Sequence, residues 1–309
     1  MSSQSRVWLV TGASSGIGLA TVQEVLAIGE RVAATTRNAS SPSSVELASL
    51  AASHPSQLRL LVVNYDPGDA SYPVSSLISQ VTSHFGRLDV VVNNAGYAVS
   101  GVVESISDEE ARKQIEVNFW APVRISREAV RWFRENNPPV QGGRVLNISS
   151  SGGFTSNPTL AYYSASKFAL EGFSEGLHKE MDPSWNIKVV AIQPGGVRTR
   201  WANGNMLDLP FPPAYADPAA LPTRFREMVK NSVFMNDPSK VGKALIAISK
   251  EANPPLRLPL GADSRYVIQS KLAAIQKELD EWKELELSVV ADDADPHFFD
   301  KVSATGIKF

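Results

Sequence analysis

Short runs of apolar residues alternate along this chain with longer stretches whose apolar positions recur at helical spacing. This alternation is typical of βαβ units, in which helices cover both faces of a parallel sheet. The apolar runs predict strands at Val7–Val10, Arg31–Thr35, Leu58–Val63, Leu88–Val92, Arg144–Ile148, Ile187–Ile192 and Leu256–Leu260. The intervening stretches predict helices near Gly16–Ile28, Ser44–Ser53, Pro73–His84, Asp108–Glu135, Ala161–Glu180 and Ser239–Glu251.

The predicted fold class is α/β, with a single doubly wound parallel sheet of about seven strands flanked by helices. Right-handed crossovers give the strand order 3-2-1-4-5-6-7 and place a ligand crevice at the carboxyl ends of the strands. We expect one domain over residues 1–309, with its cofactor and catalytic core at about 6–200.

Two segments lie beyond that core. Residues 200–238 are irregular and rich in proline, yet they carry apolar and aromatic side chains that a solvated linker lacks, so we interpret them as a substrate lid. Residues 264–309 form a C-terminal extension. Within it, Ser264–Leu287 is an expected extra helix that packs on the domain or on a neighbouring subunit, and the tail beyond Val290 is loose or wraps a partner.

The composition excludes several classes of protein. The net charge of -2 gives no field that would attract nucleic acid, and no apolar run is long enough to span a membrane. There are no cysteines, and the four histidines have no metal-ligand spacing, so we expect no metal site. The N-terminus lacks a signal-peptide pattern. We therefore expect a cytoplasmic protein.

The glycine-rich stretch Thr11–Gly18 follows the first predicted strand and opens the first helix. Glycines at 12, 16 and 18 let the backbone approach a pyrophosphate, whose charge the helix N-terminus favours. A glycine turn alone is a weak signal, because tight strand-to-helix turns also use glycine. Its place at strand one favours dinucleotide binding.

The second predicted strand discriminates between the two nicotinamide dinucleotides. An acidic residue about 20 positions after the glycines binds the ribose 2′-hydroxyl, whereas arginine accommodates a 2′-phosphate. Here the strand ends in Thr36 and Arg37 with no acidic residue, which favours NADP(H) over NAD(H). The alternative is that Arg37 is a solvated loop residue.

Tyr163 and Lys167 lie four residues apart on a predicted helix and therefore share a face. An ammonium near a phenol favours the phenolate and lowers its pKa, which brings a usable proton towards neutral pH. A lone YxxxK pattern is usually a surface pair. The serines of Ser149–Ser151, directly after a predicted strand, make a catalytic interpretation stronger.

With these motifs the chain resembles the short-chain dehydrogenase/reductase family over most of residues 6–200. The family motifs occur in order: TGxxxGIG at Thr11–Gly18, NNAG at Asn93–Gly96, an asparagine at 118, a serine after the fifth strand, YxASK at Tyr163–Lys167, and Pro194-Gly195. The resemblance implies a Rossmann-type fold and an oxidoreductase that is a homodimer or homotetramer.

The resemblance implies a catalytic set of Asn118, Ser150, Tyr163 and Lys167. Tyr163 would be the general acid and base, Ser150 would bind the substrate oxygen, and Lys167 would lower the tyrosine pKa and bind the nicotinamide ribose. Asn118 would hold a water that links Lys167 to solvent. Cofactor contacts implied by the motifs are Gly12, Ser14, Ser15, Gly16, Ile17, Gly18, Thr36, Arg37, Asn64, Tyr65, Asn94, Ala95, Gly96, Tyr163, Lys167, Pro194, Gly195, Val197 and Thr199.

The expected substrate pocket is apolar and aromatic, without a basic cluster for phosphate or carboxylate. Its candidates are Tyr97, Phe154, Leu160, Trp201, Met206, Leu207 and Phe211. They favour interconversion of a medium-sized apolar ketone and a secondary alcohol, with hydride from nicotinamide C4 and a proton from Tyr163. Two alternatives remain: a redox-neutral enzyme of the same fold (an isomerase, dehydratase or cyclase), and a non-catalytic NADP(H) sensor.

Overall fold

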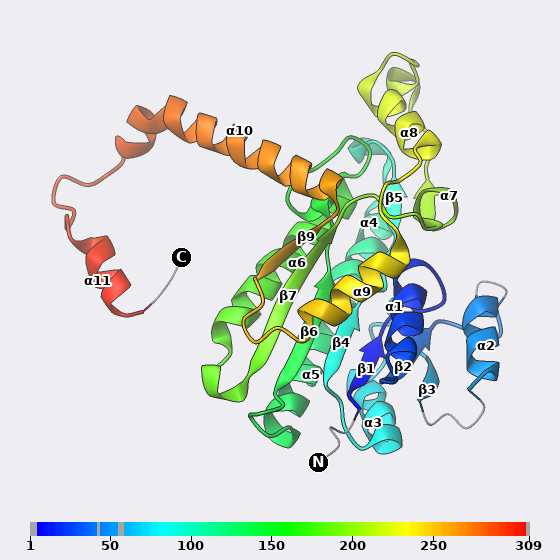
Figure 1. Ribbon diagram of the computed structural model, residues 1–309. Coiled ribbons are helices and arrows are strands. Elements are labelled where there is room, and N and C mark those ends of the chain that lie inside the picture. The colour runs from blue at the N-terminus through cyan, green and yellow to red at the C-terminus, as the bar shows by residue number, and fades with distance from the viewer. Residues whose placement is uncertain (1–4, 42–43, 55–58, 307–309) are drawn as a thin grey trace. The chain divides into compact units, whose positions relative to one another are not determined.

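The computed structural model describes residues 5–41, 44–54 and 59–306. Its main feature is a seven-stranded, all-parallel sheet in the order β3-β2-β1-β4-β6-β7-β9 (Figure 1). With the two short strands β5 and β8 of a separate sheet set aside, this is the predicted order 3-2-1-4-5-6-7, which is therefore confirmed. The strands are β1 (Val7–Val10), β2 (Arg31–Thr36), β3 (Leu60–Asn64), β4 (Val90–Asn93), β6 (Gly143–Ile148), β7 (Ile187–Pro194) and β9 (Arg257–Leu260).

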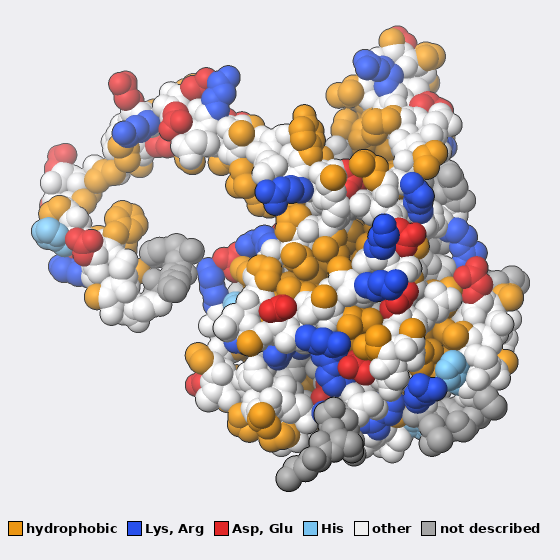
Figure 2. Space-filling view, in the orientation of Figure 1, with side chains coloured by type: hydrophobic (Ala, Val, Ile, Leu, Met, Phe, Trp, Pro, Cys, Tyr) orange, Lys and Arg blue, Asp and Glu red, His pale blue; other side chains and the backbone are white. Residues whose placement is uncertain are grey.

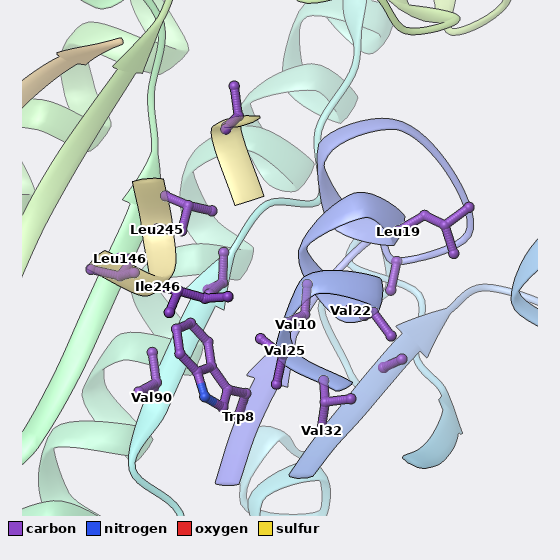
Figure 3. Close-up of a cluster of buried hydrophobic side chains, with 14 of the residues drawn as sticks. Trp8, Val10, Leu19, Val22, Val25, Val32, Val90, Leu146, Leu245 and Ile246 are labelled. Atoms are coloured by element: carbon purple, nitrogen blue, oxygen red, sulfur yellow. The ribbon is translucent and has the colours of Figure 1, made fainter. Parts of the chain in front are cut away.

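Helices cover both faces of the sheet. The first core cluster joins the sheet to α1 (Gly16–Ala27), α2 (Val45–Ala52) and α9 (Pro238–Ile248), and the second joins it to α3 (Val74–Phe85) and α5 (Ala121–Asn136). Trp8 and Val10 belong to the first cluster and Val7 and Leu9 to the second, because successive strand residues point to opposite faces. Figure 3 shows Trp8 packed beside Leu245 and Ile246 of α9.

The long predicted helix at Asp108–Glu135 has an interruption. α4 (Asp108–Ile115) passes into a π-helical turn at Glu116–Trp120 before α5 begins. A π turn inserts one extra residue and occurs frequently at functional sites, and a pattern of apolar positions does not reveal it. Asn118 lies in this turn and is fully buried.

Most other predicted boundaries differ by one or two residues from the observed ones. Capping explains some of the positions: α9 begins after Asp237, whose carboxylate accepts from the backbone N–H groups of Ser239 (2.8 Å) and Lys240 (3.1 Å). α3 ends at Gly86, which has the left-handed conformation typical of a helix C-terminus. The predicted third strand begins at Leu58, which lies outside the described residues.

The proline-rich segment after β7 contains more regular structure than its sequence predicts. It forms the short α7 (Trp201–Gly204), a strand β8 (Met206–Asp208) and the helix α8 (Leu221–Asn231). β8 pairs in parallel with β5 (Ala98–Ser100), which follows β4 in the chain. This two-stranded sheet attaches the segment to the edge of the site described below.

By its internal contacts the chain divides into two compact units, Met1–Ile268 and Gln269–Phe309. α6 (Ala161–Glu180) belongs to the first unit, and α10 (Ala262–Leu287) runs from the first into the second. The second unit also holds α11 (Phe298–Ala304) in the predicted tail, and apolar side chains such as Leu279 and Trp282 are exposed there.

The surface charges and the helices bear on two expectations from the sequence, namely the small net charge and the lack of a membrane-spanning run. Basic and acidic side chains are interspersed over the visible face of the first unit (Figure 2), which agrees with the small net charge. Within the described part of the chain, none of the helices has the length and apolarity needed for a membrane span.

Candidate active site

A cleft of about 1170 Å³ follows the carboxyl ends of the parallel strands. Its walls come from the segments that directly follow β1, β2, β3, β4, β6, β7 and β9, together with one face of α6 and parts of residues 204–234. This is the position at which doubly wound sheets bind ligands. Predicted site residues that line it are Gly12, Ser14, Ser15, Gly16, Ile17, Thr36, Arg37, Tyr65, Asn94, Gly96, Tyr97, Ser150, Leu160, Tyr163, Lys167, Pro194, Gly195, Val197, Thr199, Trp201, Met206 and Leu207.

The glycine turn after β1 has a backbone that only glycine adopts easily. Gly12 and Gly16 have φ values of 64° and 59°, in the left-handed region. A Cβ on Gly12 would lie 2.8 Å from the Cα of Ala95, and one on Gly18 would collide with the carbonyl oxygen of Gly12. Ser15, the N-cap of α1, makes no side-chain cap hydrogen bond, so the N–H groups of the first turn are available to an anion.

The asparagine motif after β4 braces this turn. The Asn94 side chain donates to the carbonyl oxygens of Thr11 (2.9 Å) and Gly12 (3.1 Å). The Thr11 hydroxyl in turn accepts from the backbone N–H groups of Asn94 (2.9 Å) and Ala95 (3.0 Å). Gly18 is buried and Ala95 is half-buried in the framework behind the turn, and neither residue lines the cleft.

At the β2 end of the cleft, Arg37 is exposed and stands next to Asn38 and Ser41 in the lining. Across the described ranges, Arg37 forms no ion pair with a carboxylate. The Thr36 hydroxyl is buried and lies 2.9 Å from the hydroxyl oxygen of Ser44, so its hydrogen-bonding capacity is directed into this loop. Of the two residues predicted to select the cofactor, Arg37 is therefore the exposed one.

The third strand places its polar residues differently from the expectation. Asn64 does not line the cleft; its side-chain oxygen accepts from the backbone N–H of Ala39 (3.2 Å) and so supports the loop that carries Arg37. The next two residues, Tyr65 and Asp66, do line it. Burial raises the pKa of Tyr65 to about 12, so this phenol stays protonated.

The catalytic candidates meet where β6 ends against α6. Ser150 caps a short 3-10 turn, and its hydroxyl oxygen accepts from the N–H of Gly152 (3.0 Å). The Tyr163 phenol and the Ser150 hydroxyl form a hydrogen bond. Lys167, one turn further along α6, has its Nζ 5.8 Å from the centre of the Tyr163 ring. These three side chains face one space.

Asn118 lies behind this group and outside the cleft lining. Its amide nitrogen donates to the carbonyl oxygen of Tyr97 (2.9 Å) and to the hydroxyl of Ser166 (3.1 Å), and its oxygen accepts from the N–H of Tyr97 (3.1 Å). Asn118 therefore ties the loop after β4 to α6. A Cβ on Gly96 would lie 3.1 Å from the Asn118 oxygen and 3.6 Å from Lys167 Nζ, so Gly96 separates the two side chains.

The electrostatics of the pair differ from the expectation that Lys167 lowers the tyrosine pKa. Burial raises the pKa of Tyr163, opposed by the Ser150 hydrogen bond. Burial also lowers the pKa of Lys167 to about 8, against the raising influence of Glu171. Below about pH 8 the site therefore holds a charged Lys167 beside a protonated Tyr163.

The apolar end of the cleft adjoins Tyr163. The ring of Trp201 lies 5.7 Å from that of Tyr163, centre to centre, and the ring of Phe234 lies 6.4 Å from that of Trp201. Leu160, Met206 and Leu207 also line this end, as expected. Lining residues that sequence reasoning missed are Phe225, Met228 and Val229 on α8, together with Phe234 and Val267.

Two predicted pocket residues do not line the cleft. Phe211 is in the connection between β8 and α8. The guanidinium carbon of Arg226 lies 3.6 Å from the centre of the Phe211 ring. Phe154 comes directly after the 3-10 turn at Ser151–Gly153, which carries the chain away from the lining. Ser164 was not predicted but lines the cleft, and its buried hydroxyl has no hydrogen-bond partner among the described residues.

Comparisons with known proteins agree with this geometry. A family model described as short chain dehydrogenase matches residues 6–208. A Schizosaccharomyces pombe protein named as an uncharacterized oxidoreductase is 37% identical over 290 residues, covering 93% of each chain. A crystal structure of a short-chain dehydrogenase from Streptomyces avermitilis has a TM-score of 0.83 and 34% identity, covering 94% of this chain and 100% of that one.

A third relative carries a more specific name. The 3-ketodihydrosphingosine reductase of Bacteroides thetaiotaomicron is 34% identical over 260 residues, covering 84% of this chain and 88% of that one. The chain thus belongs to the short-chain dehydrogenase family. It is an oxidoreductase with the dinucleotide-binding fold of that family.

Proposed function

We propose that the protein is an NADP(H)-dependent reductase that converts a largely apolar ketone into a secondary alcohol, and that also runs in reverse. The proposal rests on one observation. Ser150, Tyr163 and Lys167 lie together in one cleft, at the place where its two regions adjoin. One region has the glycine turn and Arg37, and the other has the apolar lining around Trp201.

The residues of the first region suit a nicotinamide dinucleotide. The left-handed backbone at Gly12 and Gly16, without side chains, lets the turn approach a pyrophosphate closely, and the uncapped N-terminus of α1 offers N–H donors. The Arg37 guanidinium, flanked by Asn38 and Ser41, suits a 2′-phosphate. When bound, the cofactor would supply or accept the hydride.

The chain's own residues then handle the proton and the developing charge. Ser150 donates a hydrogen bond to the substrate oxygen, and Tyr163 gives its phenolic proton to the alkoxide as that oxygen gains charge. Lys167, charged below about pH 8, stabilises the phenolate that remains. Asn118 holds the loop of Tyr97 against α6 and so keeps the lysine and tyrosine in place.

The lining of the second region supports an apolar substrate body. Its side chains are aromatic or aliphatic, from Leu160 and Trp201 to Phe225 and Val229. The Bacteroides relative is named as a reductase of 3-ketodihydrosphingosine, so a ketone of that kind is the first compound to test.

The proposal is tested by titrating the protein with NADPH and NADH and then following nicotinamide absorbance with a panel of apolar ketones. Tight NADPH binding and ketone-dependent oxidation are expected. Preference for NADH would contradict the role given to Arg37, and activity confined to charged sugar phosphates would contradict the substrate class.

A further inference from the structure

A buried carboxylate lies directly behind the candidate catalytic group. Glu171 is on α6, one turn beyond Lys167, and is only 3% exposed. It accepts hydrogen bonds from the hydroxyl of Ser149 (2.7 Å), from Nε2 of Gln193 (2.9 Å to each oxygen) and from Nε of Arg257 (3.1 Å). Every donor is a side chain of another element, so the carboxylate joins parts of the fold that are distant in the sequence.

The elements joined are those that carry the site. Ser149 precedes Ser150 at the end of β6, and Gln193 precedes Pro194 and Gly195 at the end of β7. α6 carries Tyr163 and Lys167 on the face from which Glu171 also projects, since these residues are spaced by four. One side chain thus fixes the relative positions of the serine, the cofactor-side loop and the lysine.

The packing leaves no freedom around this junction. A Cβ on Gly153 would collide with the hydroxyl of Ser149 and with Oε1 of Glu171. The glycine that ends the 3-10 turn after Ser150 is therefore required by the carboxylate behind it. Lys167 reaches the same region from the other side, where its Nζ donates to the carbonyl oxygen of Ile148 (2.8 Å).

Burying a carboxylate at this position costs folding free energy. Removing an ionised group from water costs several kcal/mol, which hydrogen bonds offset only when nearly every lone pair is used. Apolar side chains of similar volume usually fill such a space with equal or greater stability. Burial raises the pKa of Glu171, while its hydrogen bonds and the charge of Arg257 lower it.

We propose that Glu171 is a positioning residue for the reaction: it holds Ser149 and Gln193 so that Ser150 and the Pro194–Gly195 loop face Tyr163, and it places a carboxylate one turn of α6 from Lys167. This inference rests on the proposed function. Glu171 touches neither substrate nor cofactor in this assignment and acts only through its neighbours.

Among the described residues, Lys167 and Glu171 have few other charged or titratable groups beside them, and these groups determine how the pH profile is interpreted. Lys167 faces Tyr163 and is influenced by the charge of Glu171, which raises its pKa against the effect of burial. Glu171 faces Arg257, and the guanidinium of Arg257 also binds Glu175. The other neighbours of Lys167, the Ile148 carbonyl and Asn118 across Gly96, do not titrate.

The test compares three variants with wild type in the full-length protein. Glu171→Gln keeps the volume, removes the charge and presents an NH₂ group to donors, so kcat is expected to fall about 10- to 100-fold. The pH at which Lys167 loses its proton should also move lower. Glu171→Asp keeps the charge but shortens the reach to Ser149, and should reduce kcat while leaving that pH nearly unchanged.

Glu175→Gln is the matched control. Glu175 is on the next turn of α6 and shares Arg257, yet it does not contact Ser149 or Gln193. It should leave kcat and the pH profile unchanged. An equal loss of kcat in Glu171→Gln and Glu175→Gln would overturn the proposal, because the effect would then come from Arg257.

A readout without cofactor or turnover completes the test. The Lys167 side chain is titrated in the free protein by NMR of ¹³Cε-labelled lysine, with its signal assigned from Lys167→Arg. The proposal predicts a titration at lower pH in Glu171→Gln than in wild type, and an unchanged titration in Glu175→Gln. An unchanged Lys167 titration in Glu171→Gln overturns the electrostatic part.

The same set separates this inference from the proposed function. If Tyr163→Phe loses turnover while Glu171→Gln keeps both wild-type kcat and wild-type pH profile, the role of Glu171 is wrong and the reductase assignment stands. If Tyr163→Phe keeps full turnover, the proposed mechanism fails, and only the NMR titration then bears on Glu171. Should Glu171→Gln fail to fold, Ser149→Ala removes one donor and keeps the charge, and it should lower kcat without moving the Lys167 titration.

Discussion

The amine of Lys167 donates a hydrogen bond of 2.8 Å to the backbone carbonyl oxygen of Ile148, the last residue of β6. This contact holds a basic side chain inside the protein, where it is 5% exposed. Burial lowers the pKa of Lys167 from 10.5 to about 8, and a shift of that size corresponds to about 3 kcal/mol at neutral pH. Lys167 thus destabilises the fold at the pH where it is useful.

The first prediction concerns this cost. Because the folded-state pKa is lowered, the unfolded chain binds more protons between about pH 8 and 10.5, so the penalty is complete below pH 8 and disappears as the pH rises through that window. Lys167→Met should unfold at the same or a higher temperature than wild type at pH 7, with loss of most turnover. Thermal unfolding across pH checks this, and a lower stability that does not change with pH would refute it.

The second prediction concerns cofactor choice. Arg37 is the cationic side chain at the β2 end of the cleft, and charge-assisted hydrogen bonds contribute enough that its loss changes affinity by about 10- to 100-fold. Arg37→Glu should weaken NADPH binding by that factor and leave NADH binding unchanged or improved. Arg59→Glu changes the same charge at an exposed residue outside the cleft lining and is the control. Equal losses of NADPH affinity in both variants would show that the change of net charge weakens binding from a distance and that Arg37 makes no specific contact.

The third prediction concerns the glycine turn. Gly12→Ala imposes a side chain at a φ of 64° and against the Cα of Ala95, so it should destabilise the protein by about 1–2 kcal/mol or more and weaken nucleotide binding. Gly172→Ala is the matched control, because a Cβ there has open space and the residue is in the interior of α6. That control should be neutral or slightly stabilising in denaturant unfolding. Wild-type stability and nucleotide affinity in Gly12→Ala would contradict the argument from the backbone conformation of Gly12 and its contact with Ala95.

The fourth prediction concerns the wall formed by α8. Arg226 donates to the backbone oxygen of Ser100 (2.9 Å) and to its hydroxyl (3.1 Å), and stacks on Phe211. This contact fixes the helix that brings Phe225 and Val229 to the cleft. Arg226→Ala should raise the KM for an apolar ketone several-fold while the Kd for NADPH stays constant. If the Kd rises equally, α8 contributes to the cofactor region instead.

The sequence contains strong signals for some parts of this molecule and none for others. The sheet order follows from β-strand and helix alternation and from crossover handedness, and the structure has that order. α8 was not predicted, although Leu221, Phe225, Met228 and Val229 recur at helical spacing, because the many prolines of residues 200–238 led to an interpretation as an irregular lid. The three-residue strands β5 and β8 are too short to give a period.

The site shows the same division. Motifs in the sequence place Tyr163 and Lys167 on one helix face, and the structure brings them together with Ser150. A motif does not show burial, so the direction of the Tyr163 pKa shift could not be read from spacing. Glu171 looks like a solvated helix residue in the sequence, since its partners come from β6, β7 and β9.

The most direct test of the reductase proposal compares wild type with Tyr163→Phe in one experiment. Each protein is titrated with NADPH, and the nicotinamide absorbance is then followed after addition of an apolar ketone. We predict that both bind NADPH with similar affinity and that only wild type consumes it, in a ketone-dependent way. NADPH that stays unconsumed by wild type across a broad ketone panel would contradict the proposal and favour a redox-neutral enzyme or a sensor. Equal turnover in Tyr163→Phe would contradict the role of the tyrosine.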